Sequence, residues 1–219
     1  MKQINRYYKY SKISERKFRL ILRYFATDLN AFQTATLAGL THKSVNDLFL
    51  KIRLNIVREC ERLSASSFNQ SEASGPTTMN PLEYVKNAGE KAVIFGITEQ
   101  GGSIYTEAIP IEKSLFSTVV KGNMNIENII SREKQQKYDG ILSVINLKFF
   151  RLPFSIADSK THPHESERFW SFTKRRLQRF NGVPDHTFYL HLKECEYRYN
   201  NRREDLNRLL LNLLERNPI

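Results

Sequence analysis

One carboxylate, Glu167, stands at the head of a basic and aromatic segment with the sequence ERFWSFTKRRLQRF (167–180). An acidic side chain in this position could hold a divalent cation, while the basic side chains behind it could contact the phosphates of a nucleic acid. A plainer interpretation is also open. The helix dipole stabilises carboxylates at helix starts, and runs of charge often form a solvated helix face.

Apolar side chains at helical spacing give the same segment one face that should be buried. They are Phe169, Phe172, Leu177 and Phe180. If that face turns inward, the cations of the segment are expected to group on the outward side. We therefore predict phosphate contacts for four residues, Lys174, Arg175, Arg176 and Arg179.

A second candidate binding segment, between residues 31 and 51, has the pattern of a helix-turn-helix. Ala35 is small where two helices would cross, and Gly39 can adopt the positive φ that the turn requires. The start of the second helix is where base edges would be reached. The DNA-contacting residues predicted there are Thr41, which also caps the helix, with His42, Lys43, Ser44, Asn46 and Lys51. An ordinary helical hairpin with a glycine turn is the alternative.

The elements that must position these residues can be read from apolar periodicity and turn residues. Helices are predicted over residues 14–29, 31–38, 41–62, 165–180, 184–200 and 204–214. Strands are predicted over 92–97 and 103–111, which flank a Gly-Gly hairpin turn, with a short strand at 128–131 and an irregular one over 142–152. Residues 63–91 are polar and are interpreted as a linker or an eroded first strand. The predicted class is α+β.

The 219-residue chain carries a net charge of +11, concentrated at its two ends. Residues 1–62 carry +8, residues 63–167 carry −2, and residues 168–219 carry +5. This distribution favours a polyanionic partner, because each neutralised phosphate releases condensed counterions. Double-stranded DNA is the partner that best fits this charge and the helix-turn-helix pattern.

Cysteine usage and hydropathy set the expected compartment. Cys60 and Cys195 cannot form a four-thiolate zinc site and do not suggest a disulfide framework. The sequence shows no signal-peptide core and no apolar run long enough to cross a membrane. We therefore expect a cytoplasmic protein with no membrane partner.

Three motifs together resemble the insertion-sequence transposases of the ISXO-like, Merlin-related group. They are VIFGITEQGGSIYTE (93–107), YDG (138–140) and the block from Glu167 to Leu206. The resemblance implies a helix-turn-helix domain over residues 1–62 and a reduced ribonuclease-H-like domain over residues 92–219. It also implies metal-dependent DNA cleavage and strand transfer at transposon terminal repeats, with Mg²⁺ or Mn²⁺ as cofactor and a homo-oligomer acting on paired ends.

The same resemblance assigns the catalytic and metal-binding carboxylates. Glu167 matches the third of three, and Glu133 falls at the second, where the family has Asp. The first falls near Glu72, inside the polar stretch and without a strand ahead of it. Since a two-metal site needs converging carboxylates, two altered positions predict impaired cleavage. Substitution of the first carboxylate by Glu72, or recruitment of Glu165, would restore the site.

These residues lead to three hypotheses about the function of the protein. The first is a transposase, or a decayed descendant, that binds DNA with strand transfer impaired or lost. The second is a non-catalytic DNA-binding regulator derived from a transposase. The third is a translated relic with no selected role.

Overall fold

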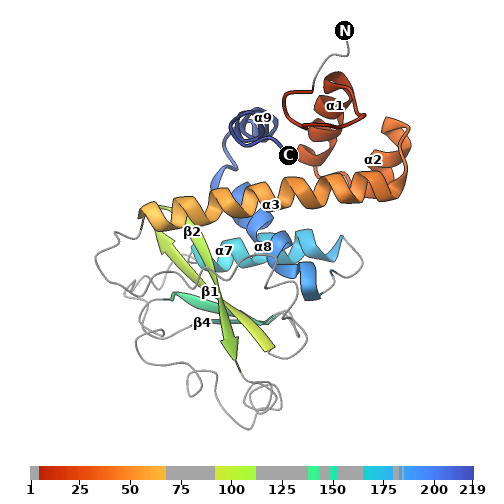
Figure 1. Cartoon of the computed structure of the whole chain (residues 1–219). Helices are drawn as coiled ribbons and strands as arrows, with labels where there is room; N and C mark the ends of the chain where they lie inside the picture. Colours follow the sequence, from red (N-terminus) through yellow and green to blue (C-terminus); the bar gives the residue numbers. More distant parts are fainter. Residues whose placement is uncertain are drawn as a thin grey trace. The chain divides into compact units, whose positions relative to one another are not determined.

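The structure is a computed structural model that describes residues 5–67, 92–111, 138–143, 148–151, 165–179, 183 and 185–219. In these residues the chain combines α-helices with a small antiparallel sheet, so the predicted α+β class is confirmed (Figure 1). The chain divides into two compact units. The first is Met1–Glu59 with Asn201–Ile219, and the second is Cys60–Asn200.

The first unit is helical. Its elements are α1 (Glu15–Ala26), α2 (Ala31–Ala38), α9 (Leu206–Arg216) and the greater part of α3 (His42–Ser67), whose last residues, from Cys60, belong to the second unit. Figure 1 shows α9, in dark blue, beside α1, in red.

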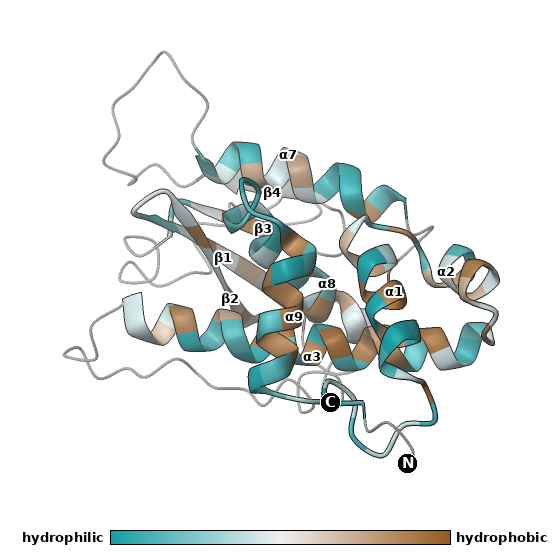
Figure 2. Ribbon diagram, turned by 90° about the horizontal axis from the view of Figure 1, so that it is seen from above, coloured by the Kyte–Doolittle hydropathy of each residue, from teal (hydrophilic) through white to brown (hydrophobic). Residues whose placement is uncertain are grey.

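Helix α1 forms because its ends are capped and its apolar residues repeat at helical spacing. The Ser14 hydroxyl accepts the Lys17 N–H at 3.4 Å, and Glu15 lies in the first turn, where the dipole favours an acid. The residues that face the core are Phe18, Ile21, Leu22 and Phe25. Figure 2 shows the resulting division of α1 and α9 into apolar, brown residues and polar, teal ones.

Helix α2 is closed at both ends by local chemistry. Asn30 and Gln33 form a capping box, in which the Gln33 N–H donates to Asn30 Oδ1 at 2.8 Å. Gly39 ends the helix with φ 58°, a left-handed conformation that favours glycine, and this confirms the predicted turn. The helix has the predicted bounds because both signals are local in sequence.

The second unit holds a four-stranded sheet with the order β2-β1-β3-β4 in the described residues. The strands are β1 (Ala92–Gln100), β2 (Ser103–Ile111), β3 (Gly140–Ser143) and β4 (Lys148–Arg151), and each neighbouring pair is antiparallel. Gly101 and Gly102, with φ values of 60° and 76°, form the predicted hairpin turn between β1 and β2.

Helices α7 (Glu165–Gln178) and α8 (Asp185–Asn200) lie on the same face of the sheet (Figure 1). Aromatic side chains fill the layer between helix and sheet. The ring of Phe95 stacks against the rings of Phe188 and Tyr189, with centroids 5.7 and 6.0 Å apart. The four aromatic residues of α8 are buried, so they belong to the core.

Several element bounds differ from those predicted; β1, for example, continues to Gln100 instead of ending at Ile97. Helix α3 continues to Ser67 instead of ending at Arg62, because the polar residues at its end find partners on the sheet. The Ser67 hydroxyl pairs with the Tyr105 hydroxyl at 2.7 Å, and Gln100 Nε2 donates to the Ser67 carbonyl at 3.3 Å. The irregular strand predicted over 142–152 is two paired strands, β3 and β4.

Other predicted features lie outside the described residues or stay predictions. The short strand at 128–131 and the polar stretch from residue 68 to residue 91 are not among the described residues. The domain bounds at 62 and 92 also stay predictions. None of the described helices is both long and apolar enough to cross a membrane.

Candidate nucleic-acid interface

The first turn of α3 carries most of the side chains predicted to contact DNA. It begins directly after the left-handed Gly39, and Thr41 caps it. The Ser44 N–H donates to Thr41 Oγ1 at 3.1 Å, and the two hydroxyl oxygens lie 2.8 Å apart. The Thr41 oxygen is therefore committed to the helix start. Thr41 and Ser44 are both exposed, so the turn presents them to solvent.

Next to this cap, His42, Lys43 and Asn46 are all exposed. Asn46 Nδ2 lies 3.2 Å from His42 Nε2, one helical turn away. The ring of Phe32, on α2, meets the His42 ring edge-on at 6.4 Å and is itself 69% exposed. The apolar residues Val45 and Leu48 are buried, so α3 is held while its polar first turn stays accessible.

Lys51 extends the same surface along α3. Its ammonium donates to the Tyr8 hydroxyl at 2.9 Å and lies 4.6 Å from the centre of the Tyr8 ring. Ser44 and Lys51 are seven residues apart, so they lie on the same face of the helix, two turns apart. The first unit thus brings Thr41, His42, Lys43, Ser44, Asn46 and Lys51 together along one exposed stretch of helix.

The cations predicted on α7 do not all face outward. Lys174, Arg175 and Arg179 are exposed, as expected. Arg176 is only 4% exposed, so the expectation that it lies on the outward face is wrong. Its guanidinium donates to Glu194 Oε1 at 2.5 Å and to Cys195 Sγ at 3.4 Å, both on α8.

Arg176 can be buried because a buried carboxylate balances its charge. Glu194, fully buried, also accepts a bond from Arg198 Nε at 2.8 Å, so one carboxylate joins two guanidinium groups. Burial raises the pKa of the neighbouring Cys195 thiol; Arg176 acts in the opposite direction, and Glu194 adds to the rise. A raised thiol pKa keeps Cys195 protonated and makes it a poor nucleophile, and burial is the largest cause of that rise.

Glu167 lies in the first turn of α7, where it is half-buried. Glu165 lies in the same turn and accepts bonds from the Tyr199 hydroxyl at 2.5 Å and from Arg168 Nη1 at 2.9 Å. These bonds tie the start of α7 to α8. They also give Glu165 a structural role, while the assignment of Glu167 as a metal-binding carboxylate stays a prediction from the family resemblance.

The predicted carboxylate partners of Glu167 lie outside the described residues. Glu133 and Glu72 both fall in that category. Among the residues that the structure does describe, no group of three or more His, Cys, Asp or Glu side chains could hold a metal ion. The described residues by themselves therefore do not make up the donor set of a two-metal centre.

Two tightly packed groups in the second unit were not predicted. Tyr138, in the YDG motif, lies over Gly96, and burial together with Glu107, to which it is hydrogen-bonded, raises the pKa of its phenol. The Lys193 ammonium, 2% exposed, donates to the Thr106 carbonyl at 2.7 Å and to Glu196 Oε2 at 2.9 Å. The family-like motifs therefore also contain residues that build the fold.

The sequence does contain a signal for the second group. Lys193 and Glu196 are three residues apart on an otherwise apolar and aromatic helix, a spacing that places them on one face. What the sequence does not show is that this face is buried against β2, where Glu196 also accepts the Thr106 N–H at 2.9 Å.

Comparison with known proteins gives one informative relative. An "Uncharacterized transposase-like protein" of Haemophilus influenzae (strain ATCC 51907 / DSM 11121 / KW20 / Rd) is 32% identical to this chain over 101 residues. Those residues are 45% of this chain and 81% of the relative. No protein-family model matches the chain, and no solved structure matches it significantly. At that identity and coverage, the chain belongs to the family of transposase-like proteins that this relative represents.

Proposed function

We propose that this chain is a transposase-family protein that binds double-stranded DNA, with the transposon terminal repeats as target and with strand cleavage and transfer impaired or lost. The single observation that best supports DNA binding is the structure of the first turn of α3. There, exposed polar and basic side chains follow a left-handed glycine turn on a helix whose apolar side is buried.

In this proposal α2 and α3 are the two helices of a helix-turn-helix, and α3 enters the major groove by its start. Asn46 can pair with the N6 and N7 edge of adenine, and Lys43 with guanine or with a phosphate. The bond between Asn46 and His42 fixes the amide before DNA arrives, so less side-chain freedom is lost on binding. Thr41 and Ser44 present hydroxyls at the helix start, where phosphates are favoured.

The exposed cations of α7 supply a second contact with the DNA backbone. Lys174, Arg175 and Arg179 carry that role, and Arg176 does not, because its charge is used inside the second unit. Contacts of this kind add affinity without reading sequence. The assignment of the second unit as a reduced ribonuclease-H-like domain rests on the motif resemblance.

A binding assay with matched variants tests the proposal. Fluorescence anisotropy with a labelled random-sequence duplex measures the affinity of the wild-type protein and of the Lys43→Ala and Asn46→Ala variants. Arg208→Ala is the control, because it removes one exposed cation from α9. Both α3 variants should bind several-fold more weakly, while the control binds like wild type. A loss in Arg208→Ala equal to that in Lys43→Ala, with no loss in Asn46→Ala, would show that only total charge matters and would overturn the α3 interface.

Cleavage is tested separately. Glu167 is the family carboxylate that the described residues retain, and Glu133 is its proposed partner in catalysis and metal binding. A nicking assay with Mg²⁺ or Mn²⁺ on supercoiled DNA compares wild type with Glu167→Ala. We expect little or no metal-dependent nicking by either protein. Efficient nicking that Glu167→Ala abolishes would show an intact site and would contradict the impaired-cleavage half.

The second candidate function is a transposase-derived regulator that binds DNA without cutting it. The two altered carboxylate positions of the family motif, at Glu133 and near Glu72, favour it over a fully active enzyme. Inverted repeats flanking the coding sequence would support a mobile element, whereas a stable genomic neighbourhood without repeats would support the regulator.

A further inference from the structure

The loop before α1 exposes an aromatic side chain in a strained backbone conformation. Tyr10 is 102% exposed and has φ 57°, a left-handed conformation that bulky L-residues rarely adopt. An exposed ring adds no packing energy to the fold, and the backbone strain costs stability. Such a residue is better explained by what it binds than by what it stabilises.

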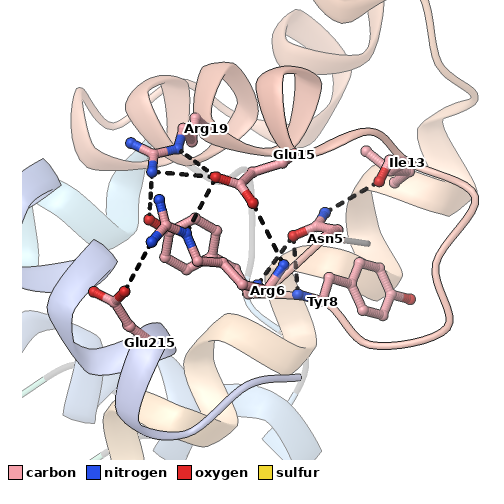
Figure 3. Close-up of polar contacts among 8 residues, drawn as sticks. Asn5, Arg6, Tyr8, Ile13, Glu15, Arg19 and Glu215 are labelled. Carbon is pink, nitrogen blue, oxygen red and sulfur yellow. Dashed lines mark hydrogen bonds and ion pairs between the residues drawn. The ribbon is translucent and has the colours of Figure 1, made fainter. Parts of the chain in front are cut away.

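The backbone of the loop is fixed from within. Asn5 Oδ1 accepts the N–H groups of Tyr7 and Tyr8 at 3.0 and 3.1 Å, and Asn5 Nδ2 donates to the Ile13 carbonyl at 3.1 Å (Figure 3). The Lys9 N–H donates to the Ile219 carbonyl at 2.8 Å. These bonds hold the main chain on both sides of Tyr10.

An arginine clamp fixes the same loop to two helices. Arg6 bonds Glu15 of α1 at 3.2 Å and Glu215 of α9 at 3.1 Å (Figure 3). Arg19 Nη2 donates to the Tyr7 hydroxyl at 2.7 Å, and the Tyr7 ring stacks on a buried phenylalanine of α1. The loop is therefore a preorganised part of the first unit, and Tyr10 projects from a rigid base.

Two lysines lie within two residues of Tyr10 in the sequence, and a third contacts the nearby Tyr8 ring. The residues of this surface, called here the Tyr10 platform, are Tyr8, Lys9, Tyr10, Lys12 and Lys51. The three lysines are exposed, and residues 8–13 contain no acidic side chain. Lys51 donates one of its three N–H groups to Tyr8, which sets the position of its charge on α3. A surface with three cations and one open ring is complementary to a nucleic-acid strand.

We propose that the Tyr10 platform binds DNA beyond the first turn of α3, with Lys9, Lys12 and Lys51 on backbone phosphates and the Tyr10 ring stacked on an unpaired base. This inference rests on the proposed DNA-binding function. Lys51 lies on the same face of α3 as Ser44, about 10 Å further along the helix axis, so one DNA molecule can reach both. In an intact duplex both faces of each base are covered by its neighbours, and only an unpaired base offers a face to the ring.

The strain at Tyr10 allows a test in which folding and binding move in opposite directions. Tyr10→Gly removes the ring and relieves the positive φ, so the Tm should stay the same or rise. Affinity for a random-sequence duplex with a single-stranded thymidine tail should fall on the order of tenfold. Affinity for the same duplex without the tail should change much less. Tyr10→Phe is the matched control, because it keeps the ring and should bind both probes like wild type.

The lysines are tested with the same two probes. Lys9→Ala and Lys12→Ala should weaken binding to both probes equally and should each reduce the salt dependence of affinity, because phosphates are present in both. Unchanged salt dependence in both lysine variants would overturn their assignment.

Other outcomes distinguish a failure of the Tyr10 proposal from a failure of the proposed DNA-binding function. If Asn46→Ala weakens binding while Tyr10→Gly binds the tailed probe like wild type, the Tyr10 platform is wrong and the α3 interface stands. An equal loss on both probes would indicate a groove contact and would overturn the stacking. If wild type binds neither probe, the proposed function itself fails. Self-association that Tyr10→Gly abolishes would identify a second copy of the chain as the occupant and would also overturn the inference.

Discussion

The phenol ring of Tyr138 lies so close to Gly96 that a Cβ added to this glycine would stand 2.5 Å from two of its ring carbons. Gly96 is in the middle of β1, and Tyr138 lies two residues before the start of β3. The absence of a side chain at residue 96 therefore lets the YDG segment pack onto the hairpin that precedes it in sequence. Two of the motifs that resemble the transposase family meet at this contact.

Gly96→Ala should destabilise the second unit by about 1–3 kcal/mol, because the methyl group overpacks the ring. Thermal or urea unfolding followed by circular dichroism measures the loss. The same substitution in a Tyr138→Ala background should cost far less, since the obstructing ring is gone. If the two mutations act additively, the contact with Tyr138 is not what excludes a side chain at residue 96.

Glu196→Gln should cost about 3–5 kcal/mol, since it leaves the Lys193 ammonium buried without its carboxylate. Burial, the largest single cause, would lower the pKa of Lys193, but Glu196, Cys60 and Glu61 together outweigh it and the pKa is raised. Glu215→Gln is the matched control. It breaks an ion pair with Arg6 in which both side chains are 53% exposed, and it should cost about 1 kcal/mol or less. Similar losses from both variants in urea unfolding would contradict the burial argument.

Adjacent arginines on α7 should have opposite phenotypes. Arg176→Ala should reduce stability by about 3 kcal/mol, because it leaves a buried carboxylate with one partner fewer. Arg175→Ala should leave the Tm nearly unchanged and weaken DNA binding, because its side chain is exposed. Differential scanning fluorimetry and anisotropy on the same two preparations give both readouts. If instead Arg176→Ala weakened DNA binding and left the Tm unchanged, Arg176 would belong to the DNA-contacting surface.

Substitutions at Thr41 separate its role as a cap from its role near DNA. Thr41→Val removes the hydroxyl that accepts the Ser44 N–H and should cost about 1 kcal/mol. Thr41→Asp keeps a capping oxygen and should preserve stability, but its negative charge should repel phosphates and weaken DNA binding. Unchanged DNA affinity in Thr41→Asp would place the first turn of α3 away from the phosphates.

The ion pairs of Glu15 with Arg6 and Arg19 should make the free energy of unfolding depend on pH. Partial burial acts to raise the pKa of Glu15, but the bonds from Arg6 and Arg19 outweigh it, and the pKa lies below its ordinary value. A lowered folded-state pKa contributes stability above the unfolded pKa, and this contribution is lost as the pH falls through the folded pKa.

Thermal unfolding between about pH 7 and pH 3 measures this dependence. Glu15→Gln should be less stable than wild type at neutral pH, and the difference should shrink as the pH falls. Curves that stay parallel over the whole range would show that the Arg6 and Arg19 bonds to Glu15 contribute no stability.

Local signals made part of the fold predictable. The helix α2, the left-handed Gly39 and the hairpin turn at Gly101 follow from capping and turn residues that lie within a few positions of each other. The end of α3 was not predictable, because Ser67 is held by Tyr105, a residue on a later strand. The composition of residues 63–67 alone indicates a linker.

The candidate site also combines features that the sequence predicts with features that it does not. Exposure of the first turn of α3 follows from the burial of Val45 and Leu48, which the helical period predicts. Burial of Arg176 depends on Glu194, which comes from another helix and cannot be paired with it from spacing. The Tyr10 platform was missed because its signal, an exposed ring at positive φ, exists only in the folded backbone.

The salt dependence of DNA binding tests the central claim most directly. The affinity of wild type for a random-sequence duplex is measured by anisotropy over a series of NaCl concentrations, beside Lys43→Ala and the Arg208→Ala control. Wild-type affinity should fall steeply and log-linearly with salt, and Lys43→Ala should reduce the slope by about 1 while the control leaves it unchanged. A wild-type affinity that is insensitive to salt, or an unchanged slope in Lys43→Ala, would contradict a phosphate-contacting interface at the start of α3.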